Sequence, residues 1–190
     1  MKANKSGSIW TAIGLLLIAA ALLLCAYNIW DSGRAAASAR NILAAMPDAL
    51  PEVSDEDEEQ TDTMDTVQVD GNEYIGKLYF PTLDLTLPVM ADWDYDKLKI
   101  APCRYSGTTD DNLVIAGHNY RSHFGSINNL QPGDEVRFTD VNGQQFVYQV
   151  AETEVLQPTA IEEMTGGDWD LTLFTCTLSG QTRLTVRCTR

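Results

Sequence analysis

The chain has 190 residues, a formal net charge of −14 at pH 7 and four cysteines. This length predicts one folded domain with accessory segments, and the acidic charge argues against a nucleic-acid partner, because phosphate binding needs a basic face. The cysteines are widely spaced and contain no Cys-x-x-Cys pair, which argues against a zinc site, a thioredoxin-like motif and a disulfide-dense scaffold. They are Cys25, Cys103, Cys176 and Cys188.

An uncharged apolar segment runs from Ile9 to Tyr27. As a helix it would span roughly 28 Å, close to the hydrocarbon thickness of a bilayer. Lys2 and Lys5 precede the segment, so the positive-inside rule predicts a cytoplasmic N-terminus. Residues 1–30 are therefore expected to form a cytoplasmic tip and a single-pass anchor in the cell membrane, with the rest of the chain extracellular. A cleaved signal peptide is the alternative, and it also places the domain outside the cytoplasm.

Residues 31–72 are expected to form a linker that is first alanine-rich and then acidic. The alanine-rich part, from Arg34 to Leu50, is predicted to continue as a short helix. The stretch from Glu52 to Asp65 is dominated by acidic side chains, which repel one another and bury too little apolar surface to become ordered. We expect a solvated tether here, and the acidic residues lack the ligand spacing of a calcium loop.

Residues 73–190 are expected to form a globular all-β domain. Short apolar runs alternate with turn residues, which is typical of an antiparallel barrel or sandwich. Asn142-Gly143 predicts a type I′ hairpin turn between two of these strands. Helical patterns are confined to Asp94–Leu98 and Ala160–Met164. The expected strands are Tyr74–Phe80, Leu83–Met90, Asn112–Ala116, Glu135–Val141, Gln144–Leu156, Leu171–Thr177 and Arg183–Cys188.

Three polar residues sit where these strands end or begin. His118 follows an apolar strand, Cys176 ends another, and Arg183 begins the last strand after a short turn. A hairpin would bring Arg183 beside Cys176, whereas spacing alone does not place His118 near either residue. A thiol nucleophile needs an acid/base partner such as an imidazole, and acyl transfer builds an oxyanion that a guanidinium can stabilise. The three residues therefore predict nucleophilic acyl transfer if they meet.

The motifs around these residues resemble the sortase family. Thr172-Leu173-Phe174-Thr175-Cys176 matches the TLxTC signature around that family's nucleophile, Arg183-Leu184-Thr185-Val186 matches the strand that carries its arginine, and Ala116-Gly117-His118-Asn119 matches the segment that carries its histidine. The resemblance covers about Tyr74 to Arg187. It implies a closed eight-stranded β-barrel with one or two short helices, so that residues 73–190 would be a sortase catalytic domain behind an N-terminal transmembrane helix.

The resemblance also implies the reaction. Cys176 would attack an LPxTG-like sorting signal after its threonine and form a thioacyl enzyme, with His118 as acid/base partner and Arg183 as oxyanion stabiliser. An amine from a cell-wall precursor or a pilin lysine would resolve the thioester. No cofactor is required and no metal site is expected; calcium, which some members bind, has no support in the sequence. The subclass stays open, although the sequence lacks the C-terminal apolar segment of the pilin-polymerising class.

Further residues are candidates for substrate binding. Thr175 precedes the proposed nucleophile, and the stretch from Gln157 to Asp170 corresponds to the family's substrate-selecting loop. Its Glu162, Glu163 and Trp169 would bias peptide choice, while a solvated loop with one packed tryptophan is the alternative.

Two other functions and one structural choice remain open. The chain could be a non-catalytic membrane-anchored surface module, which would leave the three polar residues unexplained. It could also be an L,D-transpeptidase, although that family has glycine before its cysteine, where this chain has Thr175. Cys103 and Cys188 form either a disulfide, if their Cα atoms lie within about 7 Å, or two buried free thiols.

Overall fold

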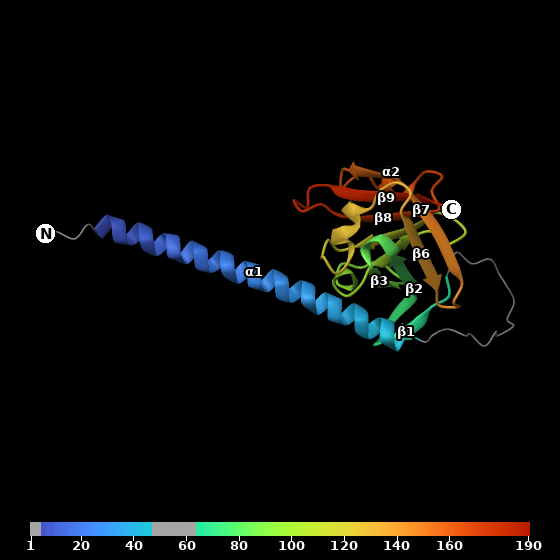
Figure 1. The fold of residues 1–190 in the computed structure, drawn as a ribbon, viewed down its shortest axis with the longest axis horizontal. Coiled ribbons are helices and arrows are strands. Elements are labelled where there is room, and N and C mark those ends of the chain that lie inside the picture. Colours follow the sequence, from blue (N-terminus) through green and yellow to red (C-terminus); the bar gives the residue numbers. More distant parts are fainter. Residues whose placement is uncertain (1–4, 47–63) are drawn as a thin grey trace. The chain divides into compact units, whose positions relative to one another are not determined.

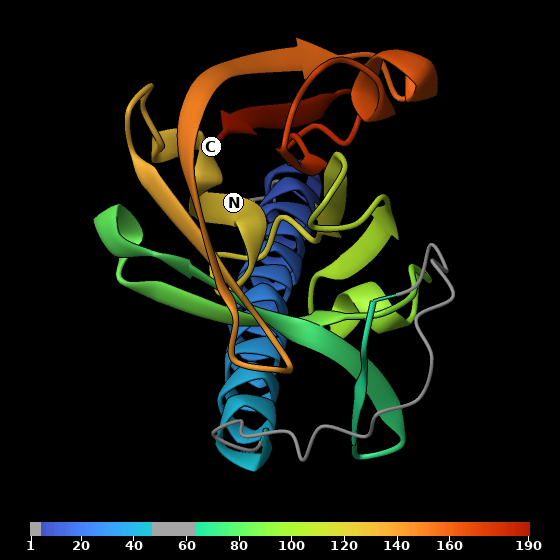
Figure 2. The same ribbon diagram turned by 90° about the vertical axis from the view of Figure 1, so that its right-hand side faces the viewer.

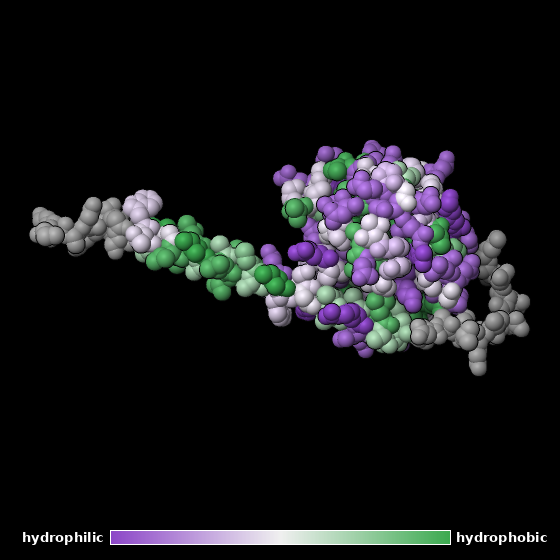
Figure 3. All heavy atoms as spheres, viewed as in Figure 1, coloured by the Kyte–Doolittle hydropathy of each residue, from purple (hydrophilic) through white to green (hydrophobic). Residues whose placement is uncertain are grey.

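A computed structural model describes residues 5–46 and 64–190, and its contacts divide the chain into two units, Met1–Arg34 and Ala35–Arg190. Helix α1 runs from Lys5 to Ala45 without interruption, past the boundary expected at residue 30 (Figure 1). Its Ile9–Ala45 part is long and apolar enough to cross a membrane. Apolar side chains cover most of the visible side of the middle part of this helix (Figure 3). Lys2 and most of the expected tether, residues 52–63, lie outside the described residues.

The last turns of α1 belong to the second unit and pack against the strands. Ala35, Ala39 and Ile42 are buried, and their spacing of three or four residues places them on one face of the helix. Ala39 joins the main core, whereas Ile42 packs in a smaller cluster with Tyr74 and other residues. The alanine-rich sequence therefore supplies a close-packing helix face.

Among the described residues of the second unit, nine strands form one sheet. Their order is β1-β2-β3-β4-β5-β8-β9-β7-β6, and a further pairing between β6 and β2 closes eight of them into a barrel, with the short β1 added beside β2. The expected closed eight-stranded barrel is therefore confirmed. The strands are β1 (Val67–Val69), β2 (Asn72–Phe80), β3 (Leu85–Met90), β4 (Cys103–Ser106), β5 (Leu113–Gly117), β6 (Glu135–Asp140), β7 (Gln145–Leu156), β8 (Leu171–Cys176) and β9 (Arg183–Thr189).

Few helices interrupt the strands. Helix α2 spans Ile161–Thr165, and three short 3₁₀ helices are η1 (Pro81–Leu83), η2 (Lys97–Lys99) and η3 (Phe124–Asn129). The long strand β7 bends as it passes from β6 to β9 (Figure 2), and its register with β9 shifts between Val150 and Glu152. Such a shift is typical of a β-bulge, which lets one strand serve two sides of a closed barrel.

The sequence had suggested an antiparallel barrel, but two of the strand pairings are parallel. β5 pairs with β8 in parallel, and β3 meets β4 in the same sense. Parallel neighbours need a long connection, and the chain between β5 and β8 supplies one that contains η3, β6, β7 and α2. The apolar runs of both strands fit this arrangement, because their inner side chains fill the core and part of their outer face is covered.

The predicted type I′ turn at Asn142-Gly143 is wrong in type, although the hairpin between β6 and β7 exists. A type I′ turn needs positive φ at both central residues, but only Gly143 has one, at 82°. The carboxylate of Asp140 instead accepts the backbone N–H groups of Asn142 at 2.9 Å and Gln144 at 2.8 Å. This local side-chain capping favours a longer loop over the two-residue turn.

Candidate active site

Cys176 and Arg183 face each other across the end of the β8–β9 hairpin. They are Cα partners in the register of the two strands, Cys176 as the last residue of β8 and Arg183 as the first of β9. The backbone N–H of Thr177 donates to the Thr182 carbonyl at 3.0 Å, and that of Gly180 to the Thr177 carbonyl at 2.8 Å. The turn is therefore closed by its own backbone, and the expected proximity of Arg183 to Cys176 is confirmed.

His118 leaves the sheet at the same end. Gly117 is the last residue of β5 and pairs with Thr175 of the parallel strand β8, so His118 follows directly beside Cys176 in the register. Gly117 has to be a glycine here, because a Cβ would lie 2.4 Å from ring atoms of Phe124. The close approach of the Phe124 ring to Gly117 places the beginning of η3 against the end of β5. The register thus places the three residues that the sequence singled out at the same end of three adjacent strands.

The cysteines differ sharply in environment. Cys176 is partly exposed, whereas Cys103 and Cys188 are fully buried, and all three are free thiols. Burial raises the pKa of both Cys103 and Cys188 to about 12, so neither thiol is ionised near neutral pH. The disulfide left open by the sequence is absent, because the two residues lie in different core clusters. Within the barrel, Cys176 is the thiol placed to react.

A pocket of about 430 Å³ opens beside Cys176. Thr175, a residue that is 3% exposed, is among those that line it, and its hydroxyl has no hydrogen-bond partner among the described residues. A buried hydroxyl without a partner is costly, and this one is covered by the surrounding residues rather than open to the pocket. The lining residues are Asn119, Phe124, Gly125, Asn128, Thr175, Cys176, Thr177, Leu178, Ser179 and Leu184.

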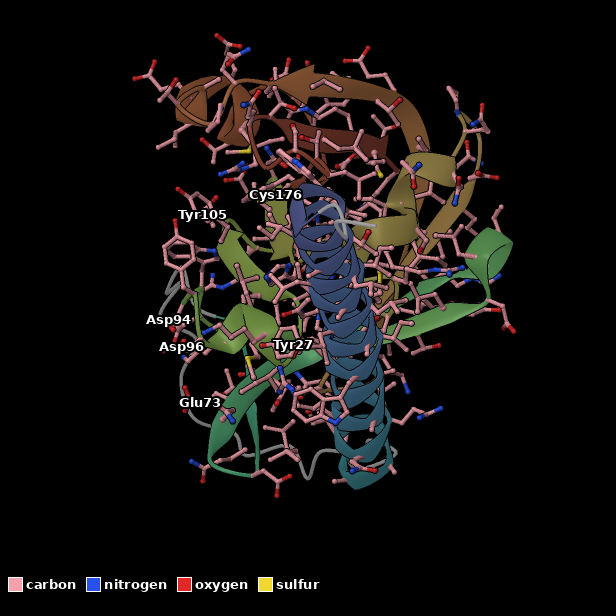
Figure 4. The ribbon with its side chains drawn as sticks, turned by 90° about the vertical axis from the view of Figure 1, so that its left-hand side faces the viewer. Tyr27, Glu73, Asp94, Asp96, Tyr105 and Cys176 are labelled. Carbon is pink, nitrogen blue, oxygen red and sulfur yellow. The ribbon has the colours of Figure 1, made fainter. Side chains whose placement is uncertain are left out.

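The outer face of β8 carries an aromatic surface near the nucleophile. Side chains alternate along a strand, so Phe174 lies on the same face as Cys176. The Phe174 ring meets Tyr105 edge-on at 5.5 Å between centroids, and Tyr105 meets Trp93 at 5.7 Å. Cys176, the last residue of β8, and Tyr105 are labelled in Figure 4. Cys176 therefore borders both the pocket at the barrel end and this apolar outer face.

The predicted substrate residues of the loop before β8 do not reach the pocket. Glu162 and Glu163 project into solvent from α2, and Trp169 lies with its ring 6.0 Å from the guanidinium of Arg187. Met164 is the residue of α2 that turns inward, where it packs with Phe174 and Ala116 on the outer face. The loop thus lies over the outer face, and of the four predicted substrate residues only Thr175 lines the pocket.

Sequence reasoning missed two polar residues that organise this region. Arg187, which is 2% exposed, donates to the carbonyl of Met164 at 2.8 Å and to the carboxylate of Glu154 at 2.7 Å. Asn119 contacts both the His118 ring and the Thr177 carbonyl. In the sequence, only the position directly after His118 pointed to Asn119. Arg187 could not be recognised, because an arginine in a terminal strand is usually a surface charge.

No group of three or more metal-ligating side chains is suited to a metal ion within residues 5–46 and 64–190. Asp92, Asp94 and Asp96, which alternate along one short segment, have local partners. Asp94 accepts the backbone N–H of Asp96 at 2.7 Å, and Asp96 pairs with Lys99 at 2.7 Å. The described part of the chain therefore gives no support to a calcium site.

A partly exposed thiol, an imidazole and a guanidinium at one end of a closed barrel are the side chains that thiol-based acyl transfer uses. A family model described as "Sortase domain" matches residues 78–190, more than half of the chain. The chain belongs to the sortase family, whose members are cysteine transpeptidases. No curated protein matches the sequence.

Solved structures agree with this assignment. Sortase C-3 from Streptococcus pneumoniae is 24% identical with a TM-score of 0.58, and the match covers 86% of this chain and 83% of that one. Sortase A from Corynebacterium diphtheriae is 24% identical with a TM-score of 0.57, covering 63% and 61%. A Clostridium perfringens sortase D5 is 23% identical with a TM-score of 0.56, covering 62% and 79%. The chain thus spans about 61% of the Corynebacterium enzyme, and a shared fold with sortases A, C and D does not choose a subclass.

Proposed function

We propose that this chain is a sortase transpeptidase that cleaves an LPxTG-like sorting signal after its threonine and transfers the new carboxyl end to an amine. One observation carries the proposal: the strand register that sets Cys176 opposite Arg183 and delivers His118 to the same end of the barrel. No other cysteine of the barrel is exposed to a substrate.

In the proposed first step the Cys176 thiolate attacks the carbonyl carbon of the scissile bond. The carbonyl electrons move to oxygen, and the resulting oxyanion is stabilised by Arg183. One nitrogen of that guanidinium donates to the carbonyls of Gly180 and Thr182, both at 3.3 Å, and the group has five N–H donors in all. His118 gives its proton to the leaving amine as the C–N bond breaks, which leaves a thioester on Cys176.

The second step reverses this pattern. An amine attacks the thioester, His118 takes the proton from the amine, and the thiolate of Cys176 leaves as the new amide forms. The amine comes from a cell-wall precursor or a pilin lysine. The reaction requires no cofactor, because proton transfer and oxyanion stabilisation account for each bond change.

The peptide would lie along the outer face of β8 and end at Cys176. Tyr105 and Trp93 are accessible there and offer aromatic contacts, and Thr175 is proposed to shape the adjoining pocket that it lines. Glu162, Glu163 and Trp169 are proposed to act at a distance from the scissile bond, at the outer edge of the loop. Helix α1 would hold the domain at the outer surface of the cell membrane with the N-terminus in the cytoplasm.

Intact-protein mass spectrometry tests the proposal directly. The full chain in detergent micelles is incubated with a panel of sorting-signal peptides, beside Cys176→Ala and Cys25→Ala. We expect a mass gain equal to one peptide's acyl half in the unmodified chain and in Cys25→Ala, but none in Cys176→Ala. An adduct that persists in Cys176→Ala would refute the assignment of the nucleophile. No adduct with any peptide, together with ordinary alkylation of Cys176, would favour a non-catalytic surface module.

A further inference from the structure

His118 is held by the two residues that follow it in the chain. Its Nδ1 lies 3.3 Å from the side-chain oxygen of Asn119, and its ring stacks on Tyr120 with 4.1 Å between centroids and 7° between planes. The amide nitrogen of Asn119 donates to the Thr177 carbonyl at 3.4 Å. Asn119 therefore connects the His118 segment with the residue that follows Cys176.

These contacts determine which ring nitrogen of His118 carries a hydrogen. A backbone carbonyl can only accept, so the Thr177 oxygen must face the NH₂ group of the Asn119 amide. The amide oxygen is then the atom that faces His118, and it also can only accept. Nδ1 must therefore be the donor, protonated in the neutral ring as well as in the charged one. Nε2 is left as the nitrogen that gains and loses a proton.

We propose that Asn119 is a positioning residue that fixes His118 in its Nδ1–H tautomer while Tyr120 holds the plane of the ring. The inference rests on the proposed function, because it concerns the acid/base role of His118. In the first step Nε2–H gives its proton to the leaving amine, and the ring stays neutral with hydrogen on Nδ1. In the second step Nε2 takes a proton from the attacking amine. Asn119 acts through His118 and through the turn after Cys176.

The chain is well suited to a direct test of this tautomer, because it contains only two histidines, His118 and His123. Long-range ¹H–¹⁵N spectra of the ring nitrogens identify the hydrogen-bearing atom, and a His123→Gln sample assigns the signals. Free neutral histidine in water favours Nε2–H, so an Nδ1–H signature reports the contact with Asn119. We expect this signature for His118 in the full chain in micelles, at a pH where the ring is neutral.

Matched variants separate the tautomer from general damage. Asn119→Asp keeps an acceptor on Nδ1, so we expect it to retain the Nδ1–H tautomer. Asn119→Leu removes the acceptor, so His118 should return to Nε2–H. Acyl-enzyme formation should then slow by about tenfold or more, with the 10²–10⁴-fold that proton transfer contributes as the upper bound. Asn129→Leu is the control, because Asn129 is exposed at the end of η3 and does not line the pocket. It should leave both measurements at the wild-type value.

Each outcome decides the inference. An Nε2–H tautomer in the unmodified chain would overturn it, as would an unchanged tautomer in Asn119→Leu. A changed tautomer with wild-type acylation would overturn the functional part. The spectra need no substrate, so an Nδ1–H signature that is lost in Asn119→Leu supports the role of Asn119 even if no peptide acylates the chain. In that case the proposed function fails and the tautomer assignment stands.

Discussion

Arg187 anchors the loop before β8 to the barrel, and its replacement gives the most demanding stability prediction. Its side chain is 3% exposed, with Nε 2.7 Å from the Glu154 carboxylate. The other nitrogens donate to the Met164 carbonyl at 2.8 Å, to the Thr172 hydroxyl at 3.1 Å and to the Glu163 carbonyl. The last carbonyls of a helix have no partner within it, so Arg187 supplies donors that α2 cannot.

The expected loss follows from these contacts. Removing one partner of a buried ion pair costs about 3–5 kcal/mol, because the other charge stays uncompensated. The Glu154 side chain is 35% exposed, which lets water replace part of the lost interaction and moves the expectation towards the lower end. The buried carbonyls that lose a donor add about 1–3 kcal/mol. We therefore expect Arg187→Met to lower the free energy of unfolding by about 4–6 kcal/mol.

Urea unfolding of the full chain in micelles, followed by near-ultraviolet circular dichroism, measures this loss. Arg137→Met is the matched control, because Arg137 also pairs with a carboxylate, Glu135, but both side chains are more than one third exposed. Exposed pairs contribute about 0–1 kcal/mol. Equal losses in the two variants, or a loss below about 1 kcal/mol for Arg187→Met at an unchanged denaturant slope, would refute the reasoning.

Three further predictions concern packing, pH and charge. Gly117→Ala should cost about 1–3 kcal/mol of stability by overpacking against Phe124, seen as a lower melting temperature, and should slow acylation by moving η3. Burial raises the pKa of Cys103 and Cys188 to about 12, from about 8.5 in the unfolded chain. Their contribution to stability is therefore complete below about pH 8.5 and is lost as the pH rises towards 12. Unfolding curves recorded between about pH 8 and 11 would detect this loss. A flat profile there would contradict this. Arg183→Ala should slow acyl-enzyme formation roughly 10²–10³-fold in rapid-quench mass spectrometry, and a loss under about tenfold would exclude an oxyanion role.

Strongly patterned segments could be predicted from the sequence. The apolar runs that became β5 and β8 are uniform enough to identify as buried strands, and the short turn before Arg183 correctly placed it beside Cys176. Two strands were missed. The segment Cys103–Ser106 is too short and too polar to show a period, and Val67–Val69 adjoins the acidic stretch, so pairing partners rather than local pattern determine both.

The polar organisation of the site could not be predicted, because it depends on contacts between distant residues. Arg187 is buried only because Glu154, 33 positions away, and the carbonyls of α2 surround it. The Asn142-Gly143 dipeptide favours a two-residue turn by itself, but the Asp140 carboxylate captures the backbone N–H groups on either side of Gly143. In both cases a side-chain hydrogen bond outweighs a local preference.

The parallel pairing of β5 with β8 is what makes the proposed site possible. An antiparallel pair would send the chain after Gly117 to the opposite end of β8, about 17 Å from Cys176 for a strand of this length. In the parallel register the end of β5 meets Thr175, so His118 and Cys176 emerge together. A slip of one residue between β8 and β9 would turn Cys176 towards the core and Thr175 outward. The hydrogen bonds between Thr177 and Thr182 close the turn at a fixed length. They therefore keep the β8–β9 register that places the Cys176 side chain on the outer face.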